Sequence, residues 1–318
     1  MTHPTRRDVL RSAAAGLALA AGAQVGGQQM KTRLYKAVIV GRIESEQMKK
    51  LKDIGFDGVE TTAIVSADEA ARARDLAEKA GMKVHSVLRG WMEFNSKDPA
   101  KVEGSIKLVE AALEAARGYG ADAVLVVPCR IGGMPMPQPW EFKIEFDEKT
   151  GHIVKVAEGD NEKYRAYIEA HNHASDTSVQ AVRKLIPAAE RAGVVIALEN
   201  VWNNLWVQPA IFAHFVRSFA SPWVKAYFDI GNHVRYAPPQ QWITALGPLL
   251  AKCHVKDFKL NPDGRGGSFC AAREGSVDWP AVRRCLDEVN YNGWLTGEDI
   301  RVSLEEFSRR LDLIIAGK

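Results

Sequence analysis

Short apolar runs alternate with longer amphipathic stretches from residue 34 to the end of the chain. The apolar runs have the length of buried strands, and the longer stretches repeat their apolar residues with helical spacing. Eight strands are predicted, at residues 34–41, 56–61, 83–88, 123–127, 194–199, 224–229, 250–255 and 294–298. A helix is predicted after each of them, at residues 44–54, 67–80, 99–119, 179–192, 209–219, 239–246, 279–289 and 304–315.

Strands that alternate with helices predict a parallel sheet, and eight such units predict a closed barrel. The expected fold is therefore α/β, a (β/α)8 TIM barrel that forms a single domain over residues 34–318. A doubly wound open sheet is the alternative, and it would be expected to carry a glycine-rich loop after its first strand. Residues 41–44, Gly-Arg-Ile-Glu, are not such a loop.

Two stretches interrupt the regular alternation. Residues 131–176 separate the fourth strand from its helix, and they contain two short alternating runs around Thr150 and Gly151. This pattern predicts a β-hairpin inserted after strand 4. A second, glycine-rich stretch at 261–276 follows the seventh strand. Because both follow a strand, both are expected at the C-terminal face of the barrel, where active sites of this fold are built.

The composition is that of an ordinary globular protein, with 46% hydrophobic and 25% charged residues among 318. The formal charge is only +3, and the first 23 residues contribute +2 of it. We therefore expect no nucleic-acid partner and no strong attraction to anionic membranes. No apolar run reaches the roughly 20 residues of a membrane-spanning helix. The four cysteines form no CxxC pair and indicate no disulfide framework.

Residues 1–23 resemble a twin-arginine export signal. Arg6 and Arg7 precede a small-residue, weakly apolar segment, 13–23, which contains two Ala-x-Ala sites. A surface amphipathic helix is the alternative, but the segment lacks the polar face that such a helix needs. The resemblance implies a periplasmic or exported protein, with residues 24–33 as a linker. No cysteine follows the apolar segment, so no stable membrane anchor is expected.

Polar residues end four of the later predicted strands: Glu199, Asp229, His254 and Glu298. In a barrel these positions bring the four side chains together at the mouth. A polar residue at one strand end is often only a cap or an ion-pair partner. Three carboxylates clustered there would repel one another, however, and a divalent cation is the simplest remedy. A mostly oxygen ligand set suits Mn²⁺, Mg²⁺ or Co²⁺ better than a structural zinc ion.

The sequence resembles the xylose isomerase-like TIM barrel superfamily, often labelled sugar phosphate isomerase/epimerase. The resemblance covers roughly residues 34–316. The segments that carry it are 55–60 (GFDGVE), 197–200 (ALEN), 228–232 (FDIGN), 254–257 (HVKD), 274–279 (EGSVDW) and 293–298 (GWLTGE). It implies that Glu199, Asp229, His254 and Glu298 hold one divalent metal ion, with Mn²⁺ the first candidate. It also implies that Glu199 and Glu298 are the catalytic acid/base groups, on either face of a small carbohydrate.

These residue types fit proton abstraction from carbon next to a carbonyl. A metal ion stabilises the resulting enediolate, and a carboxylate on each face can take the proton and return it. Return to the same carbon from the other face gives epimerisation, and return to the neighbouring carbon gives aldose–ketose isomerisation. Expulsion of a group from the β carbon would instead make the protein a lyase or hydratase of keto-glycosides.

Two positions depart from the pattern of free-ketose 3-epimerases in this superfamily. Those enzymes usually carry a histidine three residues after the aspartate and an arginine six residues after the metal histidine. Here the two positions are Asn232 and Leu260. The departures weigh against ketohexose 3-epimerisation. The expected export weighs against phosphorylated sugars, because these are intracellular.

Further residues in or just after the strands are candidates for substrate binding, and two of them, Lys256 and Asp257, are also candidates for support of the metal ligands. The set comprises Glu60, His85, Trp91, Trp202, Asn232, His233, Lys256 and Asp257. Trp140 and Trp206 also lie in or beside loops that follow strands, so four tryptophans favour an apolar pocket wall on one face. His171 and His173 form a His-x-His pair, but a solvated loop is the favoured interpretation. The side chain of Cys253 should point away from the barrel axis, into the core between the strands and the helices.

Two other classes of function are less consistent with the sequence. The superfamily also contains endonucleases that act at damaged DNA, but such an enzyme would need further metal ligands and a basic groove. A non-catalytic sugar-binding protein would leave the four residues at the strand ends unexplained. Members of this barrel family commonly associate, which makes a homo-oligomer an open expectation, although no residue marks an interface.

Overall fold

The computed structural model describes residues 30–318, and residues Thr32–Lys318 form one compact unit. The predicted export signal at 1–23 and residues 24–29 of the predicted linker lie outside the described residues. Within the described part of the chain, no helix has the length and apolar character needed to cross a membrane.

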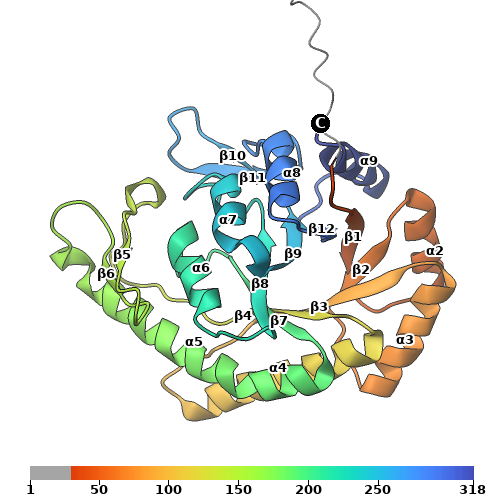
Figure 1. Ribbon diagram of the computed structural model, residues 1–318, viewed down its shortest axis with the longest axis horizontal. Coiled ribbons are helices and arrows are strands. Elements are labelled where there is room, and N and C mark those ends of the chain that lie inside the picture. Colours follow the sequence, from red (N-terminus) through yellow and green to blue (C-terminus); the bar gives the residue numbers. More distant parts are fainter. Residues whose placement is uncertain (1–29) are drawn as a thin grey trace, which may run out of the picture. The chain divides into compact units, whose positions relative to one another are not determined.

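Eight parallel strands close into a barrel in the order β1-β12-β9-β8-β7-β4-β3-β2 (Figure 1). The barrel strands are β1 (Leu34–Val40), β2 (Gly58–Thr61), β3 (Lys83–Trp91), β4 (Ala123–Val127), β7 (Val195–Glu199), β8 (Val224–Asp229), β9 (Leu250–Val255) and β12 (Gly293–Gly297). The helices are α2 (Ser45–Ile54), α3 (Ala67–Lys79), α4 (Pro99–Tyr119), α5 (Arg165–Ala192), α6 (Pro209–Arg217), α7 (Pro239–Leu246), α8 (Trp279–Glu288) and α9 (Leu304–Ile315). The prediction of a (β/α)8 barrel is confirmed.

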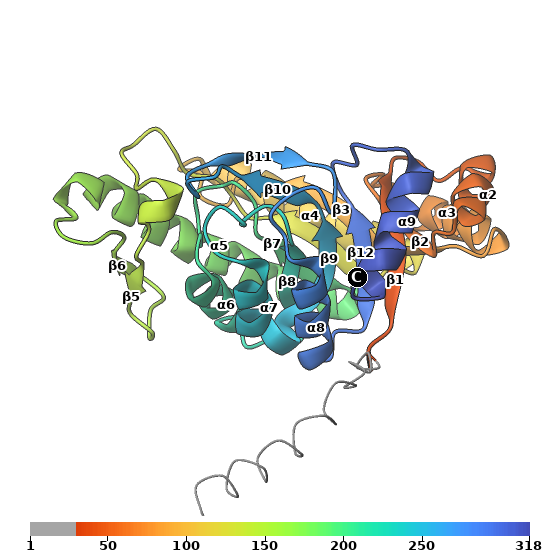
Figure 2. The same cartoon turned by 90° about the horizontal axis from the view of Figure 1, so that it is seen from above.

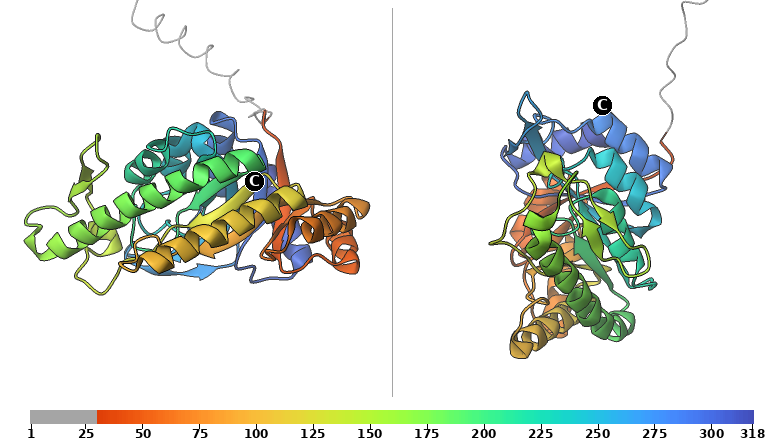
Figure 3. Two further views of the ribbon diagram at one scale, coloured as in Figure 1. Left: turned by 90° about the horizontal axis from the view of Figure 1, so that it is seen from below. Right: turned by 90° about the vertical axis from the view of Figure 1, so that its left-hand side faces the viewer.

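The helix after the fourth strand begins earlier than expected, at Arg165 instead of residue 179. Its first half carries many polar residues, which hide the apolar period from a sequence reading. The buried face nevertheless repeats with helical spacing through Tyr167, His171, Ala174 and Ser178. Figure 3 shows the long α5 running beside α4, against which it packs.

The insertion after β4 contains the predicted hairpin, built from β5 (Glu145–Phe146) and β6 (Ile153–Lys155). The loop after β9 forms a second hairpin that the sequence did not predict, β10 (Asp257–Leu260) and β11 (Gly267–Cys270), and the second of these strands lies in the glycine-rich stretch. Figure 2 shows this second hairpin beyond the ends toward which the β9 and β12 arrows point. Short one-turn helices, η1 (Pro139–Glu141), η2 (Glu162–Tyr164) and η3 (Gly247–Leu249), complete the connections.

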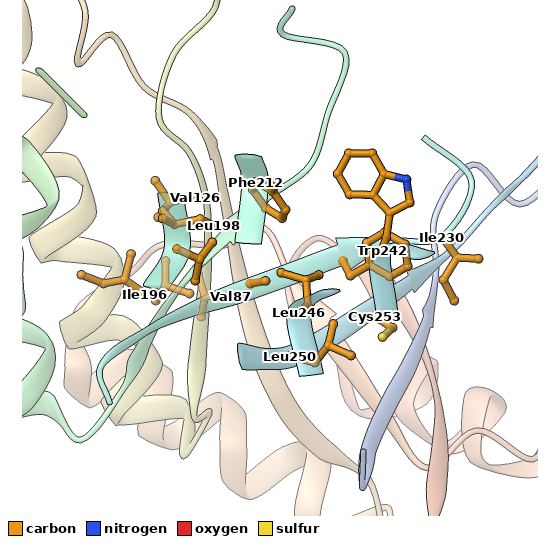
Figure 4. Packing of buried hydrophobic residues seen from close by; sticks show 14 of the residues in the cluster. Val87, Val126, Ile196, Leu198, Phe212, Ile230, Trp242, Leu246, Leu250 and Cys253 are labelled. Atoms are coloured by element: carbon orange, nitrogen blue, oxygen red, sulfur yellow. The ribbon is translucent and has the colours of Figure 1, made fainter. Parts of the chain in front are cut away.

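The main core lies between the barrel and its helices. Outward-facing strand residues such as Ile196, Leu198 and Cys253 pack there with Phe212 of α6 and Trp242 of α7 (Figure 4). Cys253 is fully buried in this layer, as expected from its place in the strand.

A smaller cluster fills the inside of the barrel and includes Ala197 and Tyr227. Alternate residues of a strand share one face. Glu199, two residues after Ala197, and Asp229, two residues after Tyr227, therefore point to the barrel axis.

Candidate metal centre at the carboxyl ends of the strands

Glu199, Asp229, His254 and Glu298 meet at the mouth of the barrel. Each offers one ligand atom, and these four atoms all lie within 4.8 Å of one another. Strand register sets this meeting, because Asp229 pairs with His254 across β8 and β9, and the Glu298 backbone N–H donates to the Val255 carbonyl. Three of the side chains are buried, while that of Glu298 is 31% exposed and faces the solvent side.

Each ligand side chain turns one buried atom toward the cluster that forms no well-aligned hydrogen bond among the described residues, only ion-pair contacts: Glu199 Oε1, Asp229 Oδ2, His254 Nδ1 and Glu298 Oε2. Buried polar atoms without hydrogen bonds are rare in folded proteins, and four that converge on one point are what a cation site without its cation would show. Three carboxylate oxygens with one imidazole nitrogen suit a divalent cation. The donor set therefore fits the metal ion that the sequence analysis expected.

The second carboxylate oxygen of Asp229 is fixed by its own loop. Asp229 Oδ1 accepts hydrogen bonds from the backbone N–H groups of Gly231 (2.8 Å) and Asn232 (2.6 Å). The side-chain amide of Asn200 forms two hydrogen bonds with the backbone of Asp229: it donates to the Asp229 carbonyl and accepts from the Asp229 N–H. Gly231 is required here because a Cβ would lie 2.6 Å from the Lys256 carbonyl oxygen. These contacts leave Oδ2 aimed at the cluster.

Glu60 orients the His254 ring from the side opposite the cluster. The Nε2 of His254 lies 2.7 Å from Glu60 Oε2, and both side chains are buried. Its Nδ1 is turned to the cluster, 3.0 Å from Glu298 Oε2 and 3.4 Å from Glu199 Oε1. A carboxylate behind a histidine fixes the tautomer and raises the basicity of the ligating nitrogen. Glu60 therefore supports a ligand.

Charge and burial shift the pKa values within the cluster in opposite directions. Burial raises the pKa of Glu199, and it raises the pKa of Asp229 to about 7. Burial opposes ionisation of Glu298, but the neighbouring His254 and Lys256 hold its pKa well below the usual range. Burial would also lower the pKa of His254, yet the Glu60 and Glu298 carboxylates raise it well above its ordinary value. Without a cation, the raised pKa of His254 favours its protonated form, which offsets part of the negative charge.

Lys256 adds a second positive charge at the rim. Its Nζ lies 3.0 Å from Glu298 Oε2, 3.4 Å from Asp229 Oδ2 and 3.2 Å from Asn232 Oδ1. Burial works to lower the pKa of Lys256, but the carboxylates of Asp229 and Glu298 raise it above its usual value. Lys256, Asn232 and Glu60 are thus predicted substrate-binding candidates that directly contact residues of the cluster.

Other candidates lie elsewhere. Asp257 is buried, and its carboxylate accepts hydrogen bonds from Phe258 N, Arg273 N, Gly275 N, Val277 N and Trp279 Nε1. It organises the loop after β9 and leaves no free oxygen for a substrate. His233 is buried against Tyr236 and Trp242, with Nε2 3.0 Å from the Val201 carbonyl oxygen.

His85 lies near the N-terminal end of β3. Its ring stacks on Trp294 at 4.4 Å, and its Nε2 is 3.0 Å from Thr296 Oγ1. It lines a cavity with Lys83 and Asp122, residues from the starts of strands. That cavity opens at the opposite face of the barrel from the cluster.

The four tryptophans do not share one surface. Trp91 and Trp140 are exposed, and Trp202 is half-buried against Phe258 and Phe269. Trp206 is buried and stacks on Phe215 at 3.9 Å, so it belongs to the core and not to a pocket wall.

The expectation that His171 is solvated is wrong. His171 is fully buried on α5, and its Nε2 accepts a hydrogen bond from the Trp206 backbone N–H. The partner His173 is exposed, so the two rings do not share a site.

Sequence reasoning missed the supporting roles of Asn200 and Glu60. Asn200 directly follows Glu199 at a strand end, and an amide at that position was an available signal. No local sequence pattern indicates that Glu60 pairs with His254, because the two residues are 194 positions apart in the chain.

The fold and the cluster together define an α/β barrel with a group of residues at the carboxyl ends of its strands that could hold a metal ion. A family model described as xylose isomerase-like TIM barrel matches residues 48–310. The chain belongs to this family.

Its curated relatives include an L-ribulose-5-phosphate 3-epimerase, UlaE, of Escherichia coli, which is 24% identical over 279 residues, with 84% of this chain and 85% of the relative covered. Among solved structures, the 3-keto-D-glucoside 4-epimerase YcjR from Escherichia coli superposes with a TM-score of 0.61 at 17% identity, covering 89% of this chain and 99% of that one. A D-psicose 3-epimerase gives a TM-score of 0.63 at 14% identity, with 89% and 100% covered. At these identities the structural likeness shows the fold alone.

Proposed function

We propose that the protein is a divalent-metal-dependent sugar isomerase of the epimerase type, with Mn²⁺ the first candidate and Co²⁺ or Mg²⁺ the alternatives. The isomerase class rests on the family and on the epimerases among its relatives. The observation that carries the proposal is the placement of Glu199 and Glu298. They come from β7 and from the end of β12, and β8 and β9 lie between these strands in the barrel.

Two carboxylates that reach one cluster from separate strands can approach a bound sugar from two sides. In the proposed reaction one of them removes the proton from carbon next to a carbonyl, and the other returns a proton to the opposite face. A divalent cation in the cluster would stabilise the negative charge on the substrate oxygens as a Lewis acid.

The pKa shifts suit different roles for the two carboxyl groups. Burial favours a protonated Glu199, while His254 and Lys256 favour an ionised Glu298. The surroundings of the two carboxyl groups therefore differ, as is typical of an acid/base pair. Lys256, 3.0 Å from Glu298 Oε2, places an ammonium group where it can donate to a substrate oxygen.

The substrate class that we propose is a small keto-sugar. The similar proteins are epimerases named for a phosphorylated ketose, a free ketose and a 3-keto-glucoside. Asn232 and Leu260 stand where free-ketose 3-epimerases usually carry histidine and arginine, which favours the keto-glycoside end of this range. We also propose export to the periplasm, on the sequence of residues 1–23.

Proton exchange with solvent tests the proposed reaction. The purified protein with Mn²⁺ is incubated in D₂O with a panel of keto-sugars and 3-keto-glycosides and followed by NMR. Deuterium gained at the carbon next to the carbonyl, without bond cleavage, is the expected result. Release of an aglycone would instead identify the lyase alternative, and no exchange with any member of the panel would contradict both.

A further inference from the structure

A second cavity lies at the same face of the barrel as the metal cluster. Its volume is about 400 Å³, within the range of small-molecule sites. Trp140 comes from the insertion after β4, Tyr236 from the loop after β8, and Gly264 from the loop after β9. Since all three loops follow strands, the cavity belongs to the C-terminal face.

A continuous row of side chains joins the cluster to this cavity. Lys256 Nζ, beside Glu298, lies 5.2 Å from the ring centre of Phe269. The Phe269 ring is 4.9 Å from Trp202, and Arg235 lies 4.3 Å over the Trp202 ring. Arg235 itself lines the cavity. Arg235 therefore links the side chains around the cluster to the lining of the cavity.

The lining of the cavity matches the two-sided chemistry of a sugar ring. Trp140 is 41% exposed and offers a flat apolar face, and Pro238 and Tyr236 add apolar surface. Aromatic faces stack well on the CH surface of a pyranose. A second sugar ring can therefore be held by stacking at this position.

Two polar side chains of the lining carry buried atoms without a hydrogen-bond partner in the described part of the chain. These atoms are Arg235 Nε, a donor, and Gln240 Oε1, an acceptor. The guanidinium of Arg235 and the amide of Gln240 bring donors and an acceptor to the lining, and hydroxyl groups, which both donate and accept, can pair with either kind. A purely apolar group would pair with neither, and a phosphate, which only accepts when fully ionised, would make no use of an acceptor.

We propose that this cavity binds a second pyranose ring, so that the preferred substrate is a disaccharide-type glycoside and not a free monosaccharide. The proposal rests on the proposed function for the reaction at the first ring. It adds a specificity site formed by Trp140, Arg235 and Gln240.

Binding of sugars to the Mn²⁺-loaded protein tests the proposal without requiring turnover. Dissociation constants are measured by calorimetry for maltose, cellobiose, sucrose and trehalose, and for D-glucose and D-fructose as monosaccharides. At least one disaccharide should bind more tightly than both monosaccharides. Trp140→Ala should weaken the binding of that disaccharide by about 3- to 10-fold, the loss expected for one aromatic contact. The affinities for the monosaccharides should stay unchanged.

Three further variants complete the test. Trp140→Phe keeps an aromatic face and should restore most of the disaccharide affinity, and Gln240→Leu should lower it by removing the acceptor. Leu108→Ala removes an equally exposed apolar side chain from α4 and should have no effect.

Disaccharides that bind no more tightly than monosaccharides, or a Trp140→Ala loss that is the same for both, would overturn the proposal. Solvent exchange with keto-monosaccharides is measured separately. If the binding experiments contradict the second-ring site, a positive exchange result would still support the proposed reaction.

Discussion

His254 and Glu60 form a buried pair in which Nε2 and Oε2 are 2.7 Å apart, and this contact turns the other ring nitrogen toward three carboxylates. Glu60 comes from β2, which β1 and β12 separate from β9 in the barrel order. The pair therefore spans the inside of the barrel and couples the metal site to a distant strand.

Glu60→Gln should weaken the binding of Mn²⁺ by about 10- to 100-fold, the usual loss when a carboxylate behind a ligating histidine is removed. The amide keeps the size of the side chain but not its charge, so His254 becomes less basic. Calorimetric titration with Mn²⁺ measures the change. Glu46→Gln, on the exposed face of α2, is the matched control. Equal affinities in the two variants would show that Glu60 does not support the site.

Divalent metal should protect the chain against heat. A ligand that binds only the folded state at 100 times its dissociation constant adds about 2.7 kcal/mol to the free energy of unfolding. The melting temperature should therefore rise when Mn²⁺ or Co²⁺ is added and fall when EDTA is added. Chelation should also abolish activity. A melting temperature indifferent to both additions would contradict a shared metal site.

Glu298→Gln should separate metal binding from proton transfer. The variant keeps one oxygen ligand, so it should retain much of its Mn²⁺ affinity. It loses the base, and a positioned base contributes about 10²–10⁴-fold in rate. Asp229→Asn is the comparison, because its expected loss is mainly in metal affinity. Full activity of Glu298→Gln in the D₂O exchange assay would remove Glu298 from the reaction.

Acid should destabilise the fold through three buried histidines outside the cluster, His85, His171 and His233, whose pKa values burial lowers. Burial lowers the pKa of His171 to about 3 and that of His233 to about 4, from an ordinary value of 6.5. Their stabilising contribution is complete above pH 6.5. It is lost as the pH falls below 6.5, because the unfolded chain then binds protons that the folded chain excludes, at about 1.4 kcal/mol per pH unit for each histidine.

Urea unfolding at pH 7 and pH 5 in EDTA measures this dependence. His171→Gln still offers an acceptor to the Trp206 N–H but does not titrate, so its pH dependence should be shallower than that of the unchanged protein. Identical slopes would mean that His171 is not the titrating group.

Export should depend on the arginine pair near the N-terminus. Replacement of Arg6 and Arg7 by lysine should leave the protein in the cytoplasm, because the twin-arginine pathway recognises the arginines. Fractionation of expressing cells followed by immunoblotting measures the distribution. Periplasmic protein at the unchanged level would refute the proposed signal.

The barrel and the meeting of its four ligand residues could be predicted because both depend on local patterns. Glu199 and Asp229 each end an apolar strand, and strand ends in a parallel barrel converge whatever the loops do. The contact of Glu60 with His254 depends on barrel closure and on depth inside it, which no local pattern encodes.

Polar residues on buried faces explain most of the remaining differences. His171 and Ser175 sit on the inner face of α5, where their hydrogen bonds to Trp206 replace the apolar contacts that a sequence reading expects. The β10–β11 hairpin escaped prediction because glycines at 264, 266 and 267 interrupt its alternation.

The hydrogen bonds of Asp257 have a consequence for how this enzyme family can vary. The Asp257 carboxylate accepts hydrogen bonds from Phe258 at the start of the long loop after β9 and from Val277 and Trp279 at its end. Both ends of this loop are therefore held in place. The tip at 261–266 lies outside these ties and is largely exposed. Changes of length or sequence there would alter what the second cavity admits while His254 stays in register, so new substrate preferences could evolve without rebuilding the metal site.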